Sequence, residues 1–256
     1  MQLIYLINAF HLDEVRGRFP NDGRMMSAVS LIEEGHGRRV RMGHLAVVGS
    51  HKVNGVSALH SDLLKQTVFS DFNTLFPGKL TNKTNGITFR RWLQQCNPGL
   101  TGLLVEACGA EVLDKPEALR KLIPLADDAA FQQKFAEAKR ANKRALATLV
   151  RDQFQLKLDP DAIFDVQIKR IHEYKRQLLN VLEAVALYDE IRSQPMKAWV
   201  PRVKIFAGKA ASSYHRAKLI IKLAHDVARV VNSDPTVRNL LKIVFLPNYN
   251  VSLAEI

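Results

Sequence analysis

The chain has 256 residues, of which 47% are hydrophobic and 24% charged, and its formal net charge is +12. This composition is typical of globular proteins, and the length allows one large or two modest domains. The sequence contains no apolar run of about 18 residues, so we predict no membrane-spanning helix and no membrane partner. The basic balance permits anionic partners. However, Lys and Arg are scattered along the chain without a nucleic-acid-binding motif, so we expect no nucleic acid partner.

The only cysteines are Cys96 and Cys108. Two cysteines in a chain of this size, without the spacing of metal ligands, are typical of reduced thiols in a cytoplasmic protein. The eight histidines show no H-E-x-x-H spacing either, so we predict no metal site.

The first third of the chain mixes helical and extended patterns. We expect helices over residues 2–17, 25–35 and 56–68, and a strand over Val40–Val48 that ends in small residues. The segment Phe76–Gly86 is rich in Pro, Gly, Asn and Thr, which is typical of a connector. We therefore predict a domain boundary there, with one domain at residues 1–83 and the other at 84–256.

The remainder begins with short helices over residues 89–123 and one long helix over 127–155. Strands and helices then alternate with short connections, which predicts a parallel sheet with right-handed crossovers, as in one half of a doubly wound α/β domain. Such sheets bind ligands at the carboxyl ends of their strands. The expected strands are Ile163–Ile168, Val203–Ala207 and Lys242–Leu246, and the expected helices are His172–Ser193 and Ser212–Val231.

The stretch IKRIHEYKRQ, residues Ile168–Gln177, places four cations where the first of these strands meets its helix. Lys169 and Arg170 follow the strand, and we expect Lys175 and Arg176 in the first turn of the helix. Cations are unfavourable at a helix N-terminus, and a bound anion would compensate for them. The pattern therefore favours a site for one or two phosphate groups. The alternative is that these side chains reach solvent and pair with acidic neighbours.

Four further loops are candidates, three of them because they follow predicted strands. The fourth, at 82–92, is a candidate because its Asn and Trp side chains suit sugar hydroxyls and a sugar ring face; alternatively it is only a turn that leads into a helix, with Arg90 and Arg91 solvated. Small residues in them would let a phosphate or sugar approach the backbone, or would only permit a tight turn. Tyr249 is either a wall of the site or a packed rim residue, and His172 is either an acid–base group or a structural donor. The loops are GSHKVNGV at 49–56, NKTNGITFRRW at 82–92, GKAASSYHRAK at 208–218 and LPNYNVSLAE at 246–255.

Together, these four blocks and IFDVQIKRIHEYKRQLLN make the chain resemble the α-glucan (glycogen, maltodextrin or starch) phosphorylase family, of bacterial type, over essentially its whole length. The resemblance implies Rossmann-like doubly wound parallel sheets of the GT-B type, with only parts of the two domains present. It also implies phosphorolysis of α-1,4-glucans by orthophosphate, which gives α-D-glucose 1-phosphate. The family uses pyridoxal 5′-phosphate, whose phosphate acts in proton transfer, and its members are usually homodimers.

The resemblance further implies roles for individual residues. Lys169 would hold the cofactor phosphate, Arg170 would bind the substrate phosphate, and Lys175 would contact both. Asn85 and Val56 would bind the glucosyl unit.

Trp92 and Tyr249 would flank the cofactor. The family's Schiff-base lysine would lie beyond Ile256, so we expect an internal fragment of about a third of the full protein, inactive by itself. The alternatives are a truncated product that only binds sugar or phosphate, and a GT-B glycosyltransferase that uses a nucleotide sugar.

Overall fold

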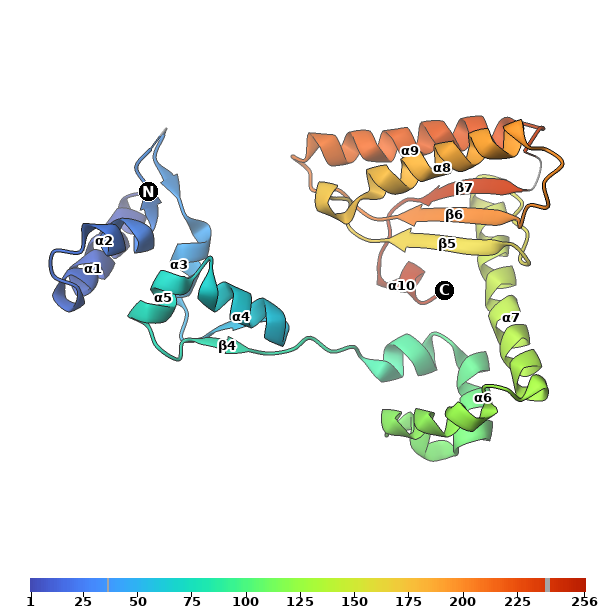
Figure 1. Cartoon of the computed structure of the whole chain (residues 1–256), viewed down its shortest axis with the longest axis horizontal. Helices are drawn as coiled ribbons and strands as arrows, with labels where there is room; N and C mark the ends of the chain where they lie inside the picture. Colours follow the sequence, from blue (N-terminus) through green and yellow to red (C-terminus); the bar gives the residue numbers. More distant parts are fainter. Residues whose placement is uncertain (36, 238–239) are drawn as a thin grey trace. The chain divides into compact units, whose positions relative to one another are not determined.

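The computed structural model describes residues 1–35, 37–237 and 240–256. It divides into two compact units, Met1–Ile87 and Thr88–Ile256 (Figure 1). Both units combine helices with parallel strand pairs, so the predicted α/β class is confirmed. No helix within the described ranges is both long and apolar enough to span a membrane.

The first unit builds a small core from helices around two strand pairs. β1 (Ile32–Glu33) and β2 (Arg39–Val40) are antiparallel, whereas β3 (Val53–Gly55) and β4 (Leu80–Asn82) are parallel. Buried Val15, Val29, Val47 and Phe72 belong to the core. The helices are α1 (Gln2–Arg18), α2 (Gly23–Val29), α3 (Met42–Gly49), α4 (Ala58–Gln66) and α5 (Ser70–Leu75).

Three of the predictions for this unit are wrong in part. The expected strand Val40–Val48 is mostly the helix α3, because Met, Leu and Ala favour a helix and the helical turn places Val47 in the core. The expected helix over 25–35 ends at Val29, after which the chain enters the β1–β2 pair. The expected connector Phe76–Gly86 contains β4, which pairs with β3.

The predicted N-terminal helix is confirmed as α1, but polar side chains form part of its buried side. Asn8 Oδ1 accepts a hydrogen bond from Leu31 N at 2.8 Å, and His11 Nε2 lies 3.2 Å from Val29 O. Burial lowers the pKa of His11. These contacts fix the position of α1 on the end of α2 and the residues that follow it, so here the buried side is selected by hydrogen bonds as well as by apolar area.

The second unit contains the predicted three-stranded parallel sheet, in the order β5–β6–β7 (Figure 1). Its strands are β5 (Ile163–Ile168), β6 (Arg202–Ala207) and β7 (Leu241–Leu246). Helices α8 (Gln177–Ser193) and α9 (His215–Ser233) cover one face, and α7 (Ala129–Phe154) and α10 (Val251–Ala254) pack on the other. The π-helical turn η1 (Arg90–Gln95), α6 (Pro98–Cys108) and the 3-10 segments Ala110–Leu113 and Pro116–Leu125 precede α7.

Alternation along β6 explains how both faces are covered. Val203, Ile205 and Ala207 belong to the core cluster with α7, whereas Phe206 belongs to the cluster with α8 and α9. All four are buried, as expected for a central strand of a parallel sheet. The sheet is therefore packed on both faces, which holds in place the carboxyl ends of its strands and the loops that follow them.

One residue of β6 departs from this apolar pattern. Lys204 is only 1% exposed, and its Nζ donates to Asp165 Oδ2 at 2.7 Å and to Asn180 Oδ1 at 2.8 Å. It also forms an ion pair with Glu183. Asp165 lies directly across from Lys204 on β5, while Asn180 and Glu183 lie on α8. The buried ammonium group thus joins α8 to the sheet.

We predict that Lys204→Met lowers the free energy of unfolding by about 2 kcal/mol or more, because it leaves a cluster of polar partners without their donor. The control is Lys222→Met, which breaks an exposed ion pair with Asp226 within α9 and should cost less than about 1 kcal/mol. Denaturant unfolding followed by circular dichroism measures both changes. Equal losses in the two variants would contradict the role of Lys204.

Candidate functional site

The three strands of the second unit end in register at one edge of the sheet. Ile168 pairs with Ala207, and Ala207 pairs with Leu246, so the loops that follow all start at the same level. Gly208 has a φ of +149°, and a Cβ added to it would lie 2.0 Å from the backbone oxygen of Lys169. Only glycine permits this approach, which brings the loops after β5 and β6 into direct contact.

The loop after β5 has a different conformation from the one predicted. Glu173–Lys175 forms a 3-10 turn, and α8 begins only at Gln177. Between them, Arg176 adopts the left-handed conformation with a φ of 62° and redirects the chain. The prediction that Lys175 and Arg176 lie in the first turn of α8 is therefore wrong.

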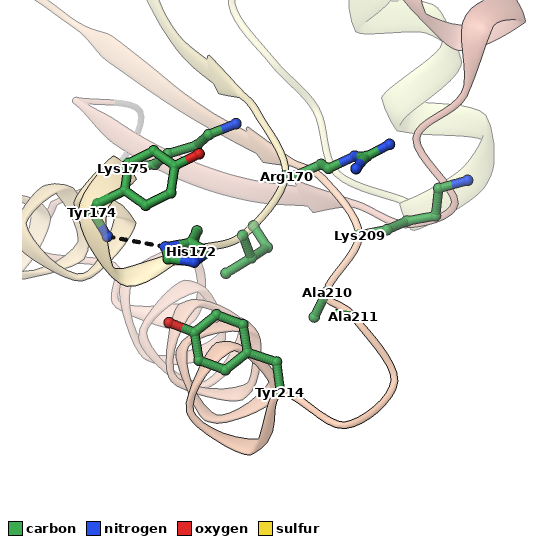
Figure 2. A pocket seen from close by; sticks show the side chains of 9 residues that line it. Arg170, His172, Tyr174, Lys175, Lys209, Ala210, Ala211 and Tyr214 are labelled. Atoms are coloured by element: carbon green, nitrogen blue, oxygen red, sulfur yellow. Dashed lines mark hydrogen bonds between the residues drawn. The ribbon is translucent and has the colours of Figure 1, made fainter. Parts of the chain in front are cut away.

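A cavity of about 430 Å³ opens between this loop and the loop after β6. Figure 2 shows the charged ends of Arg170, Lys175 and Lys209 pointing away from Tyr214, whose ring lies on the opposite side of the view. His172 lines the cavity between them, and its Nδ1 accepts a hydrogen bond from Tyr174 N at 3.3 Å. That bond gives His172 a structural role as a cap of the 3-10 turn.

The carboxylate within the loop is engaged elsewhere. Glu173 Oε2 accepts a hydrogen bond from Tyr214 Oη at 2.5 Å, and Oε1 accepts one from Arg216 at 3.0 Å. The bond from Tyr214, followed by the one from Arg216, lowers the pKa of Glu173, and the same bond raises the pKa of Tyr214. Glu173 thus ties the loop to α9 and is held away from the lysines.

The cationic side chains at the carboxyl edge of the sheet, which we call the cations of the edge, lack acidic partners within the described part of the chain. There, no carboxylate lies within 4.0 Å of the charged ends of Lys169, Arg170, Lys175 or Lys209. The pairing part of the alternative is therefore wrong for these residues, whereas its other part, that the side chains reach solvent, holds for Lys169 and Arg170, which are exposed. Clustered cations without counter-charges are an arrangement that attracts anions.

A second cavity, of about 460 Å³, adjoins the first. Trp92 and Tyr249 supply aromatic surface to it, and Arg170 and Lys209 line both cavities. Burial raises the pKa of Tyr249. The second cavity therefore combines aromatic walls with two cations that it shares with its neighbour.

An ion pair across the chain positions Trp92. Arg91 Nε donates to Glu255 Oε1 at 2.6 Å, and Gln95 contacts the same oxygen at 3.5 Å. This pair joins η1 to the residue that follows α10, and Tyr249 immediately precedes that helix. The π-helical geometry of η1 is of a kind that often occurs at functional sites.

Most of the predicted residues of the second unit line one or both cavities. Arg170 and Lys175 line the first cavity, and Arg170, Trp92 and Tyr249 line the second. Lys169 is exposed, and it is not among the residues that line either cavity.

The predicted sugar-binding residues Val56 and Asn85 lie in the first unit. They follow the parallel strands β3 and β4, and Asn85 N donates to Val56 O at 2.9 Å. Both side chains are exposed. The structure thus brings these two residues together, at the carboxyl ends of their strands.

Sequence reasoning missed two features of the site. Lys209 was identifiable, because it follows Gly208 in a loop already selected by the strand-end rule. The Arg91–Glu255 pair joins residues 164 positions apart, and no local pattern indicates it.

Comparison with known proteins identifies the family. The carbohydrate phosphorylase family matches residues 1–256. The brain form of glycogen phosphorylase from Homo sapiens is 51% identical over 255 residues, the liver form from Bos taurus 49%, and the muscle form from Oryctolagus cuniculus 48%. Each alignment covers 100% of this chain but 30% of the relative, so the chain spans about 30% of the length of the curated relatives it matches. The chain belongs to the carbohydrate phosphorylase family.

Proposed function

We propose that the protein containing this chain is an α-glucan phosphorylase, which cleaves α-1,4-glucans with orthophosphate and releases α-D-glucose 1-phosphate. The observation that carries the proposal is the cluster of Arg170, Lys175 and Lys209 around one cavity, without acidic partners in the described part of the chain. Membership of the phosphorylase family and the names of the relatives support it.

In this proposal the cations bind two phosphates, that of the substrate and that of the cofactor. Arg170 lines both cavities and binds the substrate phosphate, for which the planar guanidinium offers two parallel donors. Lys175 contributes charge from the other side of the first cavity. Fixed positive charges at the place where phosphate charge accumulates are an effective source of rate enhancement.

We propose pyridoxal 5′-phosphate as the cofactor of the second cavity. Its volume suits a small aromatic ligand, Trp92 and Tyr249 match a planar ring, and Lys209 matches a phosphate. When bound, this cofactor supplies a phosphate that exchanges a proton with the substrate phosphate. Lys169 is proposed to hold the cofactor phosphate, which is supported by the close approach of its backbone to Gly208, a residue that lines this cavity.

The glucosyl unit is proposed to bind Asn85 and Val56, which lie next to each other after β4 and β3. We also propose that residues 1–83 and 84–256 are parts of the two GT-B domains. The boundary between the compact units, after Ile87, lies four residues from the proposed division and directly after the connector, and so supports it. The bacterial type, the homodimer, the cytoplasmic location and the inactivity of the isolated chain remain predictions; the relatives named above are animal proteins.

Removing the charges should weaken phosphate binding. In the full-length protein, Arg170→Gln and Lys175→Met are each expected to raise the KM for phosphate roughly 10- to 100-fold, because each removes one charge-assisted hydrogen bond to the phosphate. Initial rates with glycogen or maltodextrin at varied phosphate measure the change. Lys222→Met, which removes an exposed cation of α9, is the control and should leave the KM unchanged. An unchanged KM in both site variants would contradict the phosphate site.

Separating the two loops should abolish activity. Gly208→Ala places a methyl group 2.0 Å from Lys169 O, so the loops must move apart. We expect at least about a 100-fold loss of phosphorolysis, because small displacements of a positioned group are costly in rate. Gly102→Ala in α6, where an added Cβ meets nothing within 4 Å, should keep full activity. Equal activity of the two variants would show that the loop contact is dispensable.

The cofactor can be tested directly by absorbance. The purified full-length protein should show the absorbance of bound pyridoxal 5′-phosphate, lose phosphorolysis when the cofactor is removed, and regain it on re-addition. Trp92→Ala should weaken cofactor retention, because it removes one wall of the second cavity. Glucosyl transfer from a nucleotide sugar, without this absorbance, would favour a different GT-B glycosyltransferase.

A further inference from the structure

A buried glutamine lies directly beneath the loop that carries the cations. Gln177, the first residue of α8, is 1% exposed. Its Nε2 donates to the backbone oxygen of Arg170 at 3.1 Å and, more weakly, to that of Lys169 at 3.5 Å. Its Oε1 accepts a hydrogen bond from His172 N at 3.4 Å. One side-chain amide therefore contacts backbone groups of three residues in this loop.

A second glutamine holds the other end of the loop. Gln167 Nε2 donates to Lys175 O at 3.0 Å, and its Oε1 accepts from Asn180 Nδ2 at 2.9 Å. Asn180 is in turn bound by the buried ammonium group of Lys204 at 2.8 Å. The backbone of Lys175 is thus connected through three side chains to the middle of the sheet.

These contacts have an electrostatic consequence for an anion site. A backbone oxygen carries partial negative charge, so a carbonyl group turned toward a bound phosphate would repel it. The carbonyl groups of Lys169, Arg170 and Lys175 are each bonded to a glutamine amide, and the amide that binds two of them is buried. They are therefore held toward the protein, while the cationic side chains can extend to the other side.

We propose that Gln177 and Gln167 are positioning residues, which fix the backbone of Lys169–Lys175 so that its cations converge on phosphate. The inference rests on the proposed function for its ligand. It gives the two glutamines a role that their neutral side chains would not reveal, since neither lines the cavities.

The chemistry at Gln177 requires an amide. The side chain must donate to two carbonyl groups and accept from one N–H, and only a primary amide of this length does both. Glutamate has the same size but, when ionised, cannot donate and would face the two carbonyl oxygens. Methionine keeps the volume and makes none of the three hydrogen bonds. Gln177→Met and Gln177→Glu therefore remove the donor while preserving the packing volume.

The test uses the full-length protein with two readouts. Hydrogen–deuterium exchange of residues 169–176 reports the loop itself, and the KM for inorganic phosphate reports its function. We expect Gln177→Met to accelerate exchange in this segment. It should also raise the KM for phosphate about 10- to 100-fold, because a small displacement of the loop moves its cations away from the phosphate. Gln177→Glu should do the same, and the KM for glucan should change less than the KM for phosphate.

The matched control is Asn232→Leu. Asn232 also binds backbone with its side-chain amide, donating to Ile243 O at 2.7 Å and accepting from Ile243 N at 3.0 Å, but it does so beside β7. This variant should lose thermal stability without changing exchange at 169–176 or the KM for phosphate. If Gln177→Met does not fold, Gln167→Met takes its place. Gln167 is only half-buried, and its loss should loosen Lys175 and raise the KM.

The outcomes separate the two proposals. Unchanged exchange in the glutamine variants overturns the positioning role, and so does faster exchange with an unchanged KM for phosphate. If the wild-type protein shows no phosphorolysis, the proposed function fails. Exchange rates and the calorimetric affinity for inorganic phosphate then decide the positioning role on their own, by the same criteria.

Discussion

The contact between Gly208 and the backbone of Lys169 is the constraint on which the candidate site depends. Parallel strands bring their carboxyl ends to one edge of the sheet, where α/β proteins bind their ligands. Here a residue without a side chain lets the loop after β6 lie against the loop after β5. As a result, Arg170 and Lys209, from two different loops, line the same pair of cavities.

In this arrangement, neutral amide groups position the loop and charged groups are left to bind an anion. The side-chain amides of Gln177 and Gln167 hold the backbone of the loop. Buried Lys204 binds Asn180, which in turn binds Gln167. Glu173, the carboxylate within the loop, binds Tyr214 and Arg216. The cations of the edge therefore repel one another in the free protein, and a bound anion relieves that repulsion. Binding to the folded state alone also stabilises it by mass action.

The parts of the fold that the sequence predicts well are those with a clear period and clear breakers. The strands β5, β6 and β7 are short apolar runs between turn residues, and the long helix α7 is rich in strong helix formers. The apolar run that became α3 has no such signal, because a short run fits a buried helix as well as a strand. The start of α8 was missed because Arg176 adopts a positive φ, which arginine rarely does.

The candidate site was predictable to the extent that the strand-end rule applies. That rule and the excess of cations selected Arg170 and Lys175, and the same rule made Tyr249 a candidate wall of the site. Family resemblance then assigned Trp92 and Tyr249 to the cofactor. The interactions that hold them could not be predicted, because they join distant residues such as Arg91 and Glu255 or involve neutral amides such as Gln177. Side-chain to backbone bonds of this kind depend on tertiary geometry that a sequence pattern does not contain.

The central claim is that the carboxyl edge of this sheet binds phosphate. A crystal structure of the full-length protein soaked with orthophosphate tests it most directly. The account predicts a phosphate in the first cavity, with its oxygens about 3 Å from the guanidinium of Arg170 and within reach of Lys175. Phosphate bound only elsewhere, with the first cavity filled by water and Arg170 turned to solvent, would contradict it.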